Sequence, residues 1–319
     1  MRTILRLSIL SKTEKKFNQK YMSIWQTHNW KELLLASAQA ESVFEVDGVF
    51  VEKRSLGLGQ FWLFVLWISP EQKIKIEKFS SLAKKENCLF VQFETISYDQ
   101  NPDFLEISKG YYKKFITPFT ALIDLSVSQE EILAQMKPKG RYNIWLAQKK
   151  WVEVFEAEKS KQNIEIFYNL MLETTSRDGF SGNTISYYER FLEIIPNSKL
   201  IFTKKDEEIL SAGIFIFDTD VSIYYYGAST SKKELRNLMA PYLMQWFAIE
   251  EAKKMWSKYY DFLWTASPWD ETSPLAWVTD FKLKFTPSQK FVSEGYMIQV
   301  SIVKLFIFQT IKNLKRLFF

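Results

Sequence analysis

The stretch VSIYYYGASTSKKELRNLMAPYLMQWFAIEEAKKMW, residues 221–256, decides the fold of this chain. Its first residues are β-branched and aromatic, as in a strand, and a polar loop follows them. Residues 234–256 then have the apolar spacing of one long helix. The next run, KYYDFLWTA, predicts another strand. A strand, a helix and a second strand in succession are typical of folds that mix helices with a sheet.

The same mixture extends over the rest of the chain. Residues 41–56 alternate about Asp47-Gly48, which predicts a β-hairpin. The runs QFWLFVLWISP and LFVQFETI predict two more strands, with a helix, KIEKFSSLAKKENC, between them. The second part repeats the pattern, with three strands within residues 199–228. We therefore predict an α/β (α+β) protein built of two similar halves.

The composition limits the chemistry. The chain has 319 residues, is 47% hydrophobic and carries a net charge of +5, which suits an anionic partner without requiring one. A single cysteine, Cys88, excludes an internal disulfide. Any histidine triad, cysteine–histidine dyad or histidine-rich zinc site would have to use His28, the only histidine. A surface turn residue before Trp30 is the simpler interpretation of His28.

No segment has the length of a membrane span. The longest apolar run, FWLFVLWI at residues 61–68, is far shorter than the ~20 residues that a spanning helix needs. The start, MRTILRLSILSK, has too short an apolar run for a signal peptide and no small-residue cleavage site. We therefore expect a cytoplasmic protein.

The segment MKPKGRYNIWLAQKKWVEV, residues 136–154, combines cations with apolar residues. A capping box at Ser128 and Glu131 begins a helix that Pro138 and Gly140 interrupt, and a new helix is expected from Arg141. One side of it should pack, and the other should meet either an anionic partner or solvent. The packing side holds Ile144, Ala147 and Trp151, and the polar side holds Lys137, Arg141, Trp145 and Gln148.

The unit at residues 221–256 is similar to the centre of a GNAT-type acyltransferase. In that fold a glycine-rich loop binds the pyrophosphate of acyl-CoA at a helix N-terminus. The loop here, GASTSKKELRNL, has one glycine and lacks the Arg/Gln-x-x-Gly-x-Gly/Ala pattern. An acyl-CoA donor is therefore not expected.

The chain resembles the Fem-type (FemABX) aminoacyltransferases over about residues 85–290. The segment at 136–154 is the strongest match, and further matches are FVQFE, FYNLMLETTSRDGF, SAGIFIF, YYYGAS, RNLMAPYLMQWFAIEEAKK, YYDFLW and FKLKF. Two departures occur: YDF continues as LWTASPWDETSP instead of a Trp-Gly-Ile-like turn, and Thr286-Pro287 replaces the glycine after FKLKF. The first 80 residues match poorly.

The resemblance implies two GNAT-like acyltransferase domains without a coiled-coil arm, residues 1–145 with 296–319 and residues 146–295. It implies transfer of an amino acid from aminoacyl-tRNA, as co-substrate, to an amine of a peptidoglycan stem peptide. The acceptor would be a UDP-linked or lipid-linked muropeptide precursor. No cofactor or metal is implied, and we expect a monomer with peripheral contact at the inner membrane surface. The alternatives are a GNAT-type N-acyltransferase with another donor and a non-catalytic relative that binds tRNA or membrane.

The resemblance also assigns residues, each with a simpler structural alternative. Lys282 would be the catalytic cation in FKLKF, on a strand whose other face carries Phe281; the alternative is an exposed edge-strand lysine. For the tRNA, the basic loop before the long helix is the candidate, and the alternative is a solvated loop balanced by Glu234. The tRNA-binding candidates are Lys232, Lys233 and Arg236. The substrate-binding candidates are Phe281, Arg177, Thr175, Tyr224, Tyr226, Arg141 and Glu94.

Some of these candidates have specific alternatives. Arg177 suits phosphate or carboxylate but could pair with Asp178. Tyr224 and Tyr226 are expected on one face of a strand, beside a groove or in the core. The C-terminal run SIVKLFIFQTIKNLKRLFF is a basic amphipathic helix, which suits either an interfacial anchor or a helix docked on the first domain by its apolar face.

Overall fold

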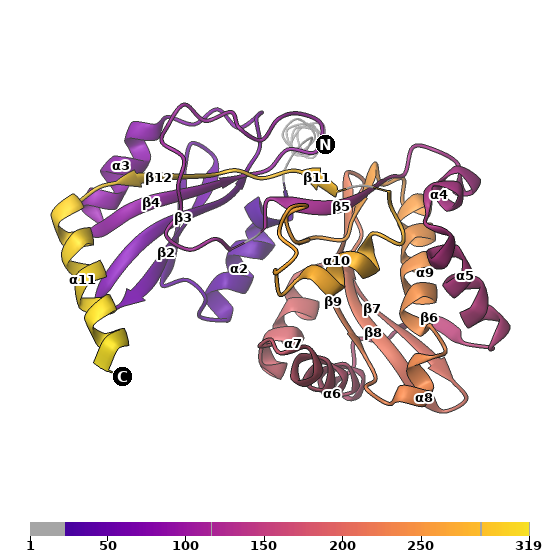
Figure 1. Cartoon of the computed structure of the whole chain (residues 1–319). Helices are drawn as coiled ribbons and strands as arrows, with labels where there is room; N and C mark the ends of the chain where they lie inside the picture. Colours follow the sequence, from indigo (N-terminus) through magenta and orange to yellow (C-terminus); the bar gives the residue numbers. More distant parts are fainter. Residues whose placement is uncertain (1–22, 116, 288, 319) are drawn as a thin grey trace, which may run out of the picture. The chain divides into compact units, whose positions relative to one another are not determined.

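A computed structural model describes residues 23–115, 117–287 and 289–318, and for residues 312–318 it describes the backbone alone. The chain forms two compact units (Figure 1). Unit 1 comprises Met1–Lys113 and Ser293–Phe319, and unit 2 comprises Lys114–Val292. In the part of the chain that the structure describes, no helix is long and apolar enough to cross a bilayer.

Unit 1 is built on a five-stranded sheet in the order β1-β2-β3-β4-β12. The Asp47-Gly48 turn, with φ of 52° and 72°, joins β1 to β2 as predicted. Strands β3 and β4 run parallel, with α3 as the crossover. Its elements are η2 (Ile24–Gln26), α2 (His28–Ala36), β1 (Ser42–Val46), β2 (Val49–Gly57), β3 (Gln60–Ile68), α3 (Ile76–Lys85), β4 (Cys88–Thr95), β12 (Gly295–Gln299) and α11 (Ile302–Phe318).

Both faces of this sheet are covered. On one face, Phe79 and Ala83 of α3 pack against apolar residues of β2, β3 and β4. On the other face, Trp62 and Phe90 contact the ring of Tyr112. Every residue of β4 is buried, as a central parallel strand requires.

Unit 2 is built on a seven-stranded sheet in the order β11-β5-β10-β9-β8-β7-β6. Among the described strands of this sheet, β9 and β10 alone run parallel, and α8 and α9 form the crossover between them. The sheet thus repeats the strand–helix–strand unit of unit 1. Its strands are β5 (Phe119–Asp124), β6 (Glu153–Ala157), β7 (Ser198–Lys205), β8 (Glu208–Ile216), β9 (Val221–Ser229), β10 (Tyr259–Asp261) and β11 (Gln289–Phe291).

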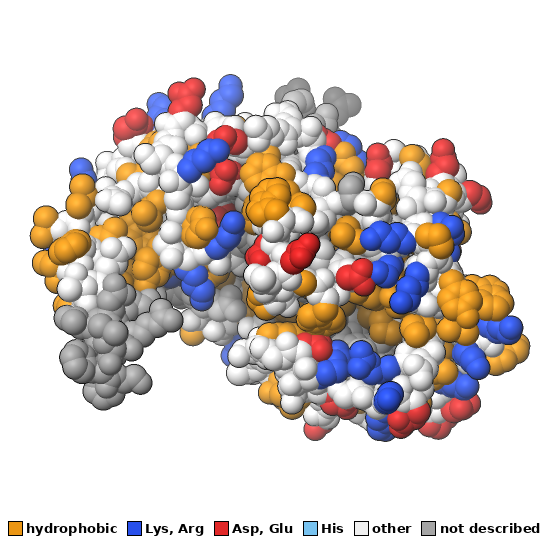
Figure 2. Space-filling model, viewed as in Figure 1, with side chains coloured by type: hydrophobic (Ala, Val, Ile, Leu, Met, Phe, Trp, Pro, Cys, Tyr) orange, Lys and Arg blue, Asp and Glu red, His pale blue; other side chains and the backbone are white. Residues whose placement is uncertain are grey.

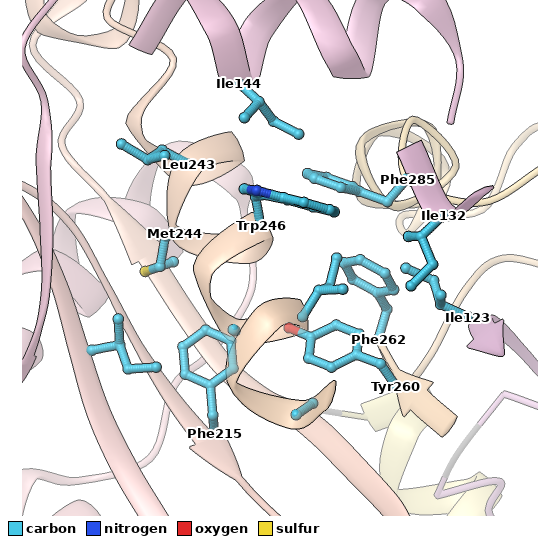
Figure 3. Packing of buried hydrophobic residues seen from close by; sticks show 14 of the residues in the cluster. Ile123, Ile132, Ile144, Phe215, Leu243, Met244, Trp246, Tyr260, Phe262 and Phe285 are labelled. Atoms are coloured by element: carbon cyan, nitrogen blue, oxygen red, sulfur yellow. The ribbon is translucent and has the colours of Figure 1, made fainter. Parts of the chain in front are cut away.

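The helices of unit 2 cover the two faces of this sheet (Figure 1). Helices α5 and α9 pack against each other over a core that includes Ile144, Trp246 and Phe262 (Figure 3). Helices α6 and α7 pack on the other side, against β9 and β7. The helices are α4 (Gln129–Gln135), α5 (Pro138–Lys149), α6 (Lys161–Asp178), α7 (Ile185–Ile194), α8 (Lys233–Arg236), α9 (Ala240–Lys254) and α10 (Ala276–Lys282).

The predicted α/β fold of two GNAT-like units without a coiled-coil arm is confirmed for the described residues. The boundary between the two units differs from the predicted one, because residues 114–145 belong to unit 2 and not to the first domain. These residues form β5, α4 and the start of α5, and β5 pairs with β10 and β11 in the second sheet.

Three predicted elements differ. The long helix at 234–256 is two helices, because Met239 takes a φ of 56° and Pro241 opens α9. The second helix of residues 136–154 begins at Pro138 instead of Arg141, since proline suits a first helical turn. The segment FKLKF comprises the last two residues of α10 and the turn after it, and is not a strand.

Candidate active site

Lys282 is buried at the last position of α10, with only 6% of the residue exposed. Its Nζ donates hydrogen bonds to the backbone oxygens of Leu263 at 2.7 Å and Trp264 at 3.1 Å. The interpretation as an exposed edge-strand lysine is therefore wrong. An ammonium has three N–H donors, so one donor remains beyond these two carbonyls when the lysine is charged.

The two carbonyls belong to a loop with unusual backbone angles. Strand β10 ends at Asp261, and Leu263 and Trp264 take φ values of 52° and 23°. Residues other than glycine rarely adopt such backbone angles, and each residue that does so costs on the order of 1–3 kcal/mol of folding free energy. The Asp261 carboxylate supports the turn by accepting from the Leu263 amide at 2.7 Å and from the Thr120 hydroxyl. The loop thus turns carbonyl groups towards Lys282 at a cost in strain.

Hydrogen bonds from three elements fix this loop. The Thr265 amide donates to Phe119 O at 3.0 Å, and the Ala266 amide donates to the Thr279 hydroxyl of α10 at 2.8 Å. Gln289 Nε2 of β11 donates to Ala266 O. These contacts hold the carbonyls in place before any ligand binds, which is the preorganisation that catalysis by charge stabilisation needs.

Two polar atoms of the loop are buried without a hydrogen-bond partner among the described residues, namely Trp264 Nε1 and Thr265 Oγ1. An orphaned buried donor costs about 1–3 kcal/mol, so proteins seldom retain one without a reason. A bound substrate that accepts hydrogen bonds would offset this cost. Strain, a buried cation and orphaned donors therefore coincide in one short segment.

Burial lowers the pKa of Lys282 from 10.5 to about 7, because desolvation disfavours the charged ammonium. The nearby Asp261 carboxylate opposes this shift by favouring the charge. A buried amine with a pKa near neutrality exists in both protonation states under physiological conditions. It can therefore donate to a developing negative charge or accept a proton.

The segment 136–154 packs on the turn that carries this lysine. The Lys137 amide donates to Lys284 O at 3.0 Å, and a Cβ on Gly140 would lie 2.4 Å from the same oxygen. Only glycine therefore fits at position 140. The predicted packing of Ile144 and Ala147 is confirmed, whereas Trp151 is 84% exposed because it follows the end of α5 with a φ of 59°.

The Arg141 guanidinium donates to three backbone oxygens at the end of α4, those of Leu133, Ala134 and Met136. These contacts cap carbonyls that the helix leaves without partners. The observed contacts of Arg141 are thus structural.

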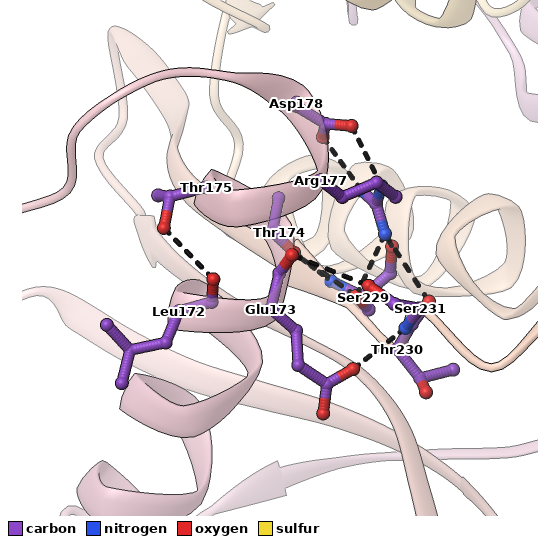
Figure 4. Close-up of polar contacts among 9 residues, drawn as sticks. All are labelled: Leu172, Glu173, Thr174, Thr175, Arg177, Asp178, Ser229, Thr230 and Ser231. Carbon is purple, nitrogen blue, oxygen red and sulfur yellow. Dashed lines mark hydrogen bonds and ion pairs between the residues drawn. The ribbon is translucent and has the colours of Figure 1, made fainter.

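Arg177 and Thr175 do not converge on a common point (Figure 4). Arg177 pairs with both carboxylate oxygens of Asp178 at 2.8 Å and donates to Ser229 O at 3.2 Å. The predicted alternative, an ion pair with Asp178, is what the structure shows. Thr175 Oγ1 donates to Leu172 O within α6. Arg177 therefore ties the end of α6 to the end of β9.

Tyr224 and Tyr226 lie on opposite faces of β9, so their predicted placement on one face is wrong. The register shifts between Ile214 and Phe215, which pair with Tyr226 and Tyr224, and this bulge inserts one extra residue. Tyr224 stacks on Phe215 with ring centroids 5.2 Å apart. The Tyr226 hydroxyl donates to that of Tyr187 at 3.2 Å, on the side of α7. Period-two alternation cannot reveal such a bulge.

The remaining candidates have varied surroundings. Glu94 is buried in β4 of unit 1 and accepts from Gln92 Nε2 at 3.1 Å. Phe281 packs against Tyr242 with ring centroids 5.1 Å apart, at the edge of the unit 2 core. In the basic loop, Lys232 pairs with Glu208. The other two cations of that loop, Lys233 and Arg236, are exposed.

Sequence reasoning missed Asp261, Trp264 and Thr265. The signal that points to Asp261 is an acidic residue inside the apolar strand run KYYDFLWTA, where burial of a carboxylate requires partners. Among the residues that the structure describes, no three histidine, cysteine or acidic side chains are grouped to hold a metal ion.

Comparison with known proteins gives the family. The profile of the FemAB family matches residues 67–203 and 194–292, so the chain belongs to the FemAB family and is a transferase. The crystal structure of FemX has a TM-score of 0.66 at 15% identity and covers 86% of this chain and 92% of its own. L-PGS from Bacillus licheniformis has a TM-score of 0.51 at 14% identity, covering 80% of this chain and 83% of its own. No curated protein sequence matches significantly.

Proposed function

We propose that the protein transfers an amino acid from aminoacyl-tRNA to an amine of a peptidoglycan precursor stem peptide. The observation that carries this proposal is the buried Lys282 ammonium beside the strained carbonyl loop, in a chain of the FemAB family. The similarity to FemX supports the fold that the proposal requires. The acceptor is a muropeptide precursor, linked either to UDP or to a lipid.

The reaction needs little chemistry from the protein, because the ester of aminoacyl-tRNA is already activated. The acceptor nitrogen attacks the ester carbonyl carbon and forms the new C–N bond. Negative charge develops on the carbonyl oxygen, and the remaining N–H donor of Lys282 stabilises it. The C–O bond to the ribose then breaks, and the proton lost by the amine passes to the departing ribose oxygen. The single histidine of the chain is not required.

The test is to incubate the purified protein with a pool of charged tRNAs and, separately, with UDP-linked and lipid-linked muropeptide precursors. Mass spectrometry of the muropeptide should show the mass of one or more added amino acids. A parallel incubation with acetyl-CoA should give no product, since the sequence lacks the pyrophosphate loop. Acetylation without aminoacyl transfer would overturn the proposal.

A further inference from the structure

Helix α11, Ile302–Phe318, docks on unit 1 by a narrow edge. Leu305 and Phe308 are both 4% exposed, and the Phe308 ring lies 6.4 Å from that of Tyr112. The Val300 and Ser301 amides both donate to Leu89 O of β4, which fixes the start of the helix on the sheet. The helix is therefore held to unit 1 by one side of its first turns.

The face beside this edge is apolar and exposed. Its residues recur at helical spacing on one side of α11, and this side does not face the sheet of unit 1. Figure 2 shows these apolar side chains together where α11 begins. The exposed members are Ile302 (69%), Val303 (70%), Phe306 (68%), Ile307 (50%) and Ile311 (41%).

The sequence leaves two interpretations of this helix, an interfacial anchor and a helix docked by its apolar face. Val303, Ile307 and Ile311 share one side of the helix, and the structure exposes all three, which does not fit docking by that side. Single exposed apolar residues are ordinary, but a contiguous stripe on a monomer marks an interaction surface. Covering this stripe therefore needs a partner with an apolar surface.

Charge identifies that partner. Residues 301–319 contain four cations, Lys304, Lys312, Lys315 and Arg316, and no acid. The Lys304 ammonium contacts Asn87 Oδ1 at 3.0 Å, just beyond the end of α3, where Lys84 and Lys85 are exposed. Cations therefore border the apolar stripe. A second copy of this basic surface would be repelled, whereas an anionic bilayer attracts the cations and accepts the apolar side chains.

We propose that α11 is an interfacial helix that binds unit 1 to the surface of an anionic phospholipid bilayer. Its 17 residues would lie in the plane of the interface, with the apolar stripe among the acyl chains and Lys304 at the headgroups. The inference rests on α11 and on the cations beside it, and it does not depend on the proposed function.

The experiment is vesicle flotation of the full chain with phosphatidylglycerol–phosphatidylcholine vesicles and with pure phosphatidylcholine vesicles. The parent protein should float with the anionic vesicles and much less with the neutral ones. The double variant Ile302→Ser, Phe306→Ser should reduce the bound fraction at least tenfold, because it removes two exposed apolar groups. Both positions are exposed, so thermal unfolding should be unchanged.

The matched control is Trp151→Ser, Trp256→Ser, which removes two still more exposed aromatic residues, 84% and 88%, from unit 2. Flotation of this control should equal that of the parent. Equal losses in both variants, or no flotation of the parent, would overturn the proposal. Sedimentation without vesicles gives a further check, since a dimer that only the α11 variant dissociates would show that a second copy covers the stripe.

Discussion

Units 1 and 2 share one construction and differ at the end of one strand. Each contains a parallel strand pair joined by a helical crossover, β3–α3–β4 and β9–α8/α9–β10. In each, the strand after the crossover carries a buried acid, Glu94 on β4 and Asp261 on β10. Strand β4 ends one residue after Glu94, at Thr95, and the Thr95 and Ile96 amides still donate to backbone oxygens, those of Glu294 and Ile68. Strand β10 stops at Asp261, and the chain bends into the strained loop.

This difference decides where chemistry is available. In unit 1 the backbone amides after Glu94 remain committed to neighbouring segments of the sheet. A strand that ends early leaves carbonyl groups for another partner, and here the partner is the buried Lys282 ammonium. In unit 1 the Glu94 carboxylate accepts a hydrogen bond from the Gln92 side-chain amide. The strained loop and the buried lysine therefore support the proposal that the reacting centre lies in unit 2.

The largest effect should follow from Lys282→Met. Removal of a donor that stabilises an oxyanion typically lowers turnover ~10²–10³-fold. We expect that decrease in aminoacyl transfer measured under single-turnover conditions, with the loop still folded because methionine fills a similar volume. The matched control is Lys253→Met, which removes another lysine that donates to two backbone oxygens, those of Leu125 and Val127, and should leave turnover within a few-fold of the parent. A Lys282→Met protein with parental turnover would remove the lysine from the mechanism.

The same variant should be more stable than the parent, in a way that depends on pH. The pKa of Lys282 is about 7 in the folded protein, whereas its ordinary value is 10.5. Below pH 7 the folded parent therefore holds a buried charge. From about pH 7 to 10.5 the unfolded chain binds the proton that the folded chain releases, so the free energy of unfolding of the parent rises.

Lys282→Met lacks this pH-dependent contribution. Its free energy of unfolding should exceed that of the parent by on the order of a few kcal/mol at pH 6, and this difference should shrink towards pH 10. Denaturant unfolding at both pH values measures it. The control is Lys233→Met, because an exposed lysine bears no such burial cost. An advantage that grew with pH would contradict the assigned direction of the shift.

Much of the fold could be predicted from the sequence, and the active-site geometry could not. The hairpin at Asp47-Gly48, strands β3 and β4 and the crossover helix α3 follow from local patterns that burial reinforces. The bulge at Tyr225 and the φ values of Leu263 and Trp264 depend on tertiary contacts. No residue type predicts these features, since glycine, the usual signal, is absent at Tyr225 and at Leu263 and Trp264.

The site residues show the same division. The family motif selects Lys282, and the burial and low pKa of this lysine give that choice a physical basis. The strand predicted there is wrong, because FKLKF alternates like a strand while α10 ends there. Arg141 and Arg177 resemble ligand-binding cations in sequence, yet each contacts backbone oxygens of a neighbouring element. Sequence alone cannot separate a cation that binds substrate from one that caps structure.

A smaller effect should distinguish the two acids. The Asp261 carboxylate raises the pKa of Lys282 against the larger effect of burial. Asp261→Asn should therefore lower that pKa further below its value of about 7. If charged Lys282 stabilises the oxyanion, transfer falls as the pH rises through this pKa, and the falling limb should move to lower pH in the variant.

The measurement is the pH profile of single-turnover transfer for Asp261→Asn, with Glu94→Gln as the matched control. The control should keep the parental midpoint, because the carboxylate that raises the pKa of Lys282 is that of Asp261. A lower plateau with an unmoved midpoint in Asp261→Asn would reduce the aspartate to support of the Leu263 turn. A shift in both variants would end the distinction between the two acids.

The smallest effect concerns the two crossovers and tRNA. Both carry exposed cations, Lys84 and Lys85 at the end of α3 in unit 1, and Lys233 and Arg236 on α8 in unit 2. Lys232 is already paired with an acid, so it is the weaker candidate of the basic loop. The two pairs therefore offer equal charge on corresponding elements of the two units.

If unit 2 receives the tRNA, the double variant Lys233→Ala, Arg236→Ala should bind it more weakly at low salt. The slope of log affinity against log salt concentration should become shallower by ~0.7–0.9 for each phosphate that is no longer neutralised. The variant Lys84→Ala, Lys85→Ala removes the same charge from unit 1 and should keep the parental slope, as titrations of a charged tRNA at several salt concentrations would show. An equal loss of tRNA affinity in the two variants would mean that tRNA binding responds only to net charge. The crossover of unit 2 would then not be the tRNA-binding site.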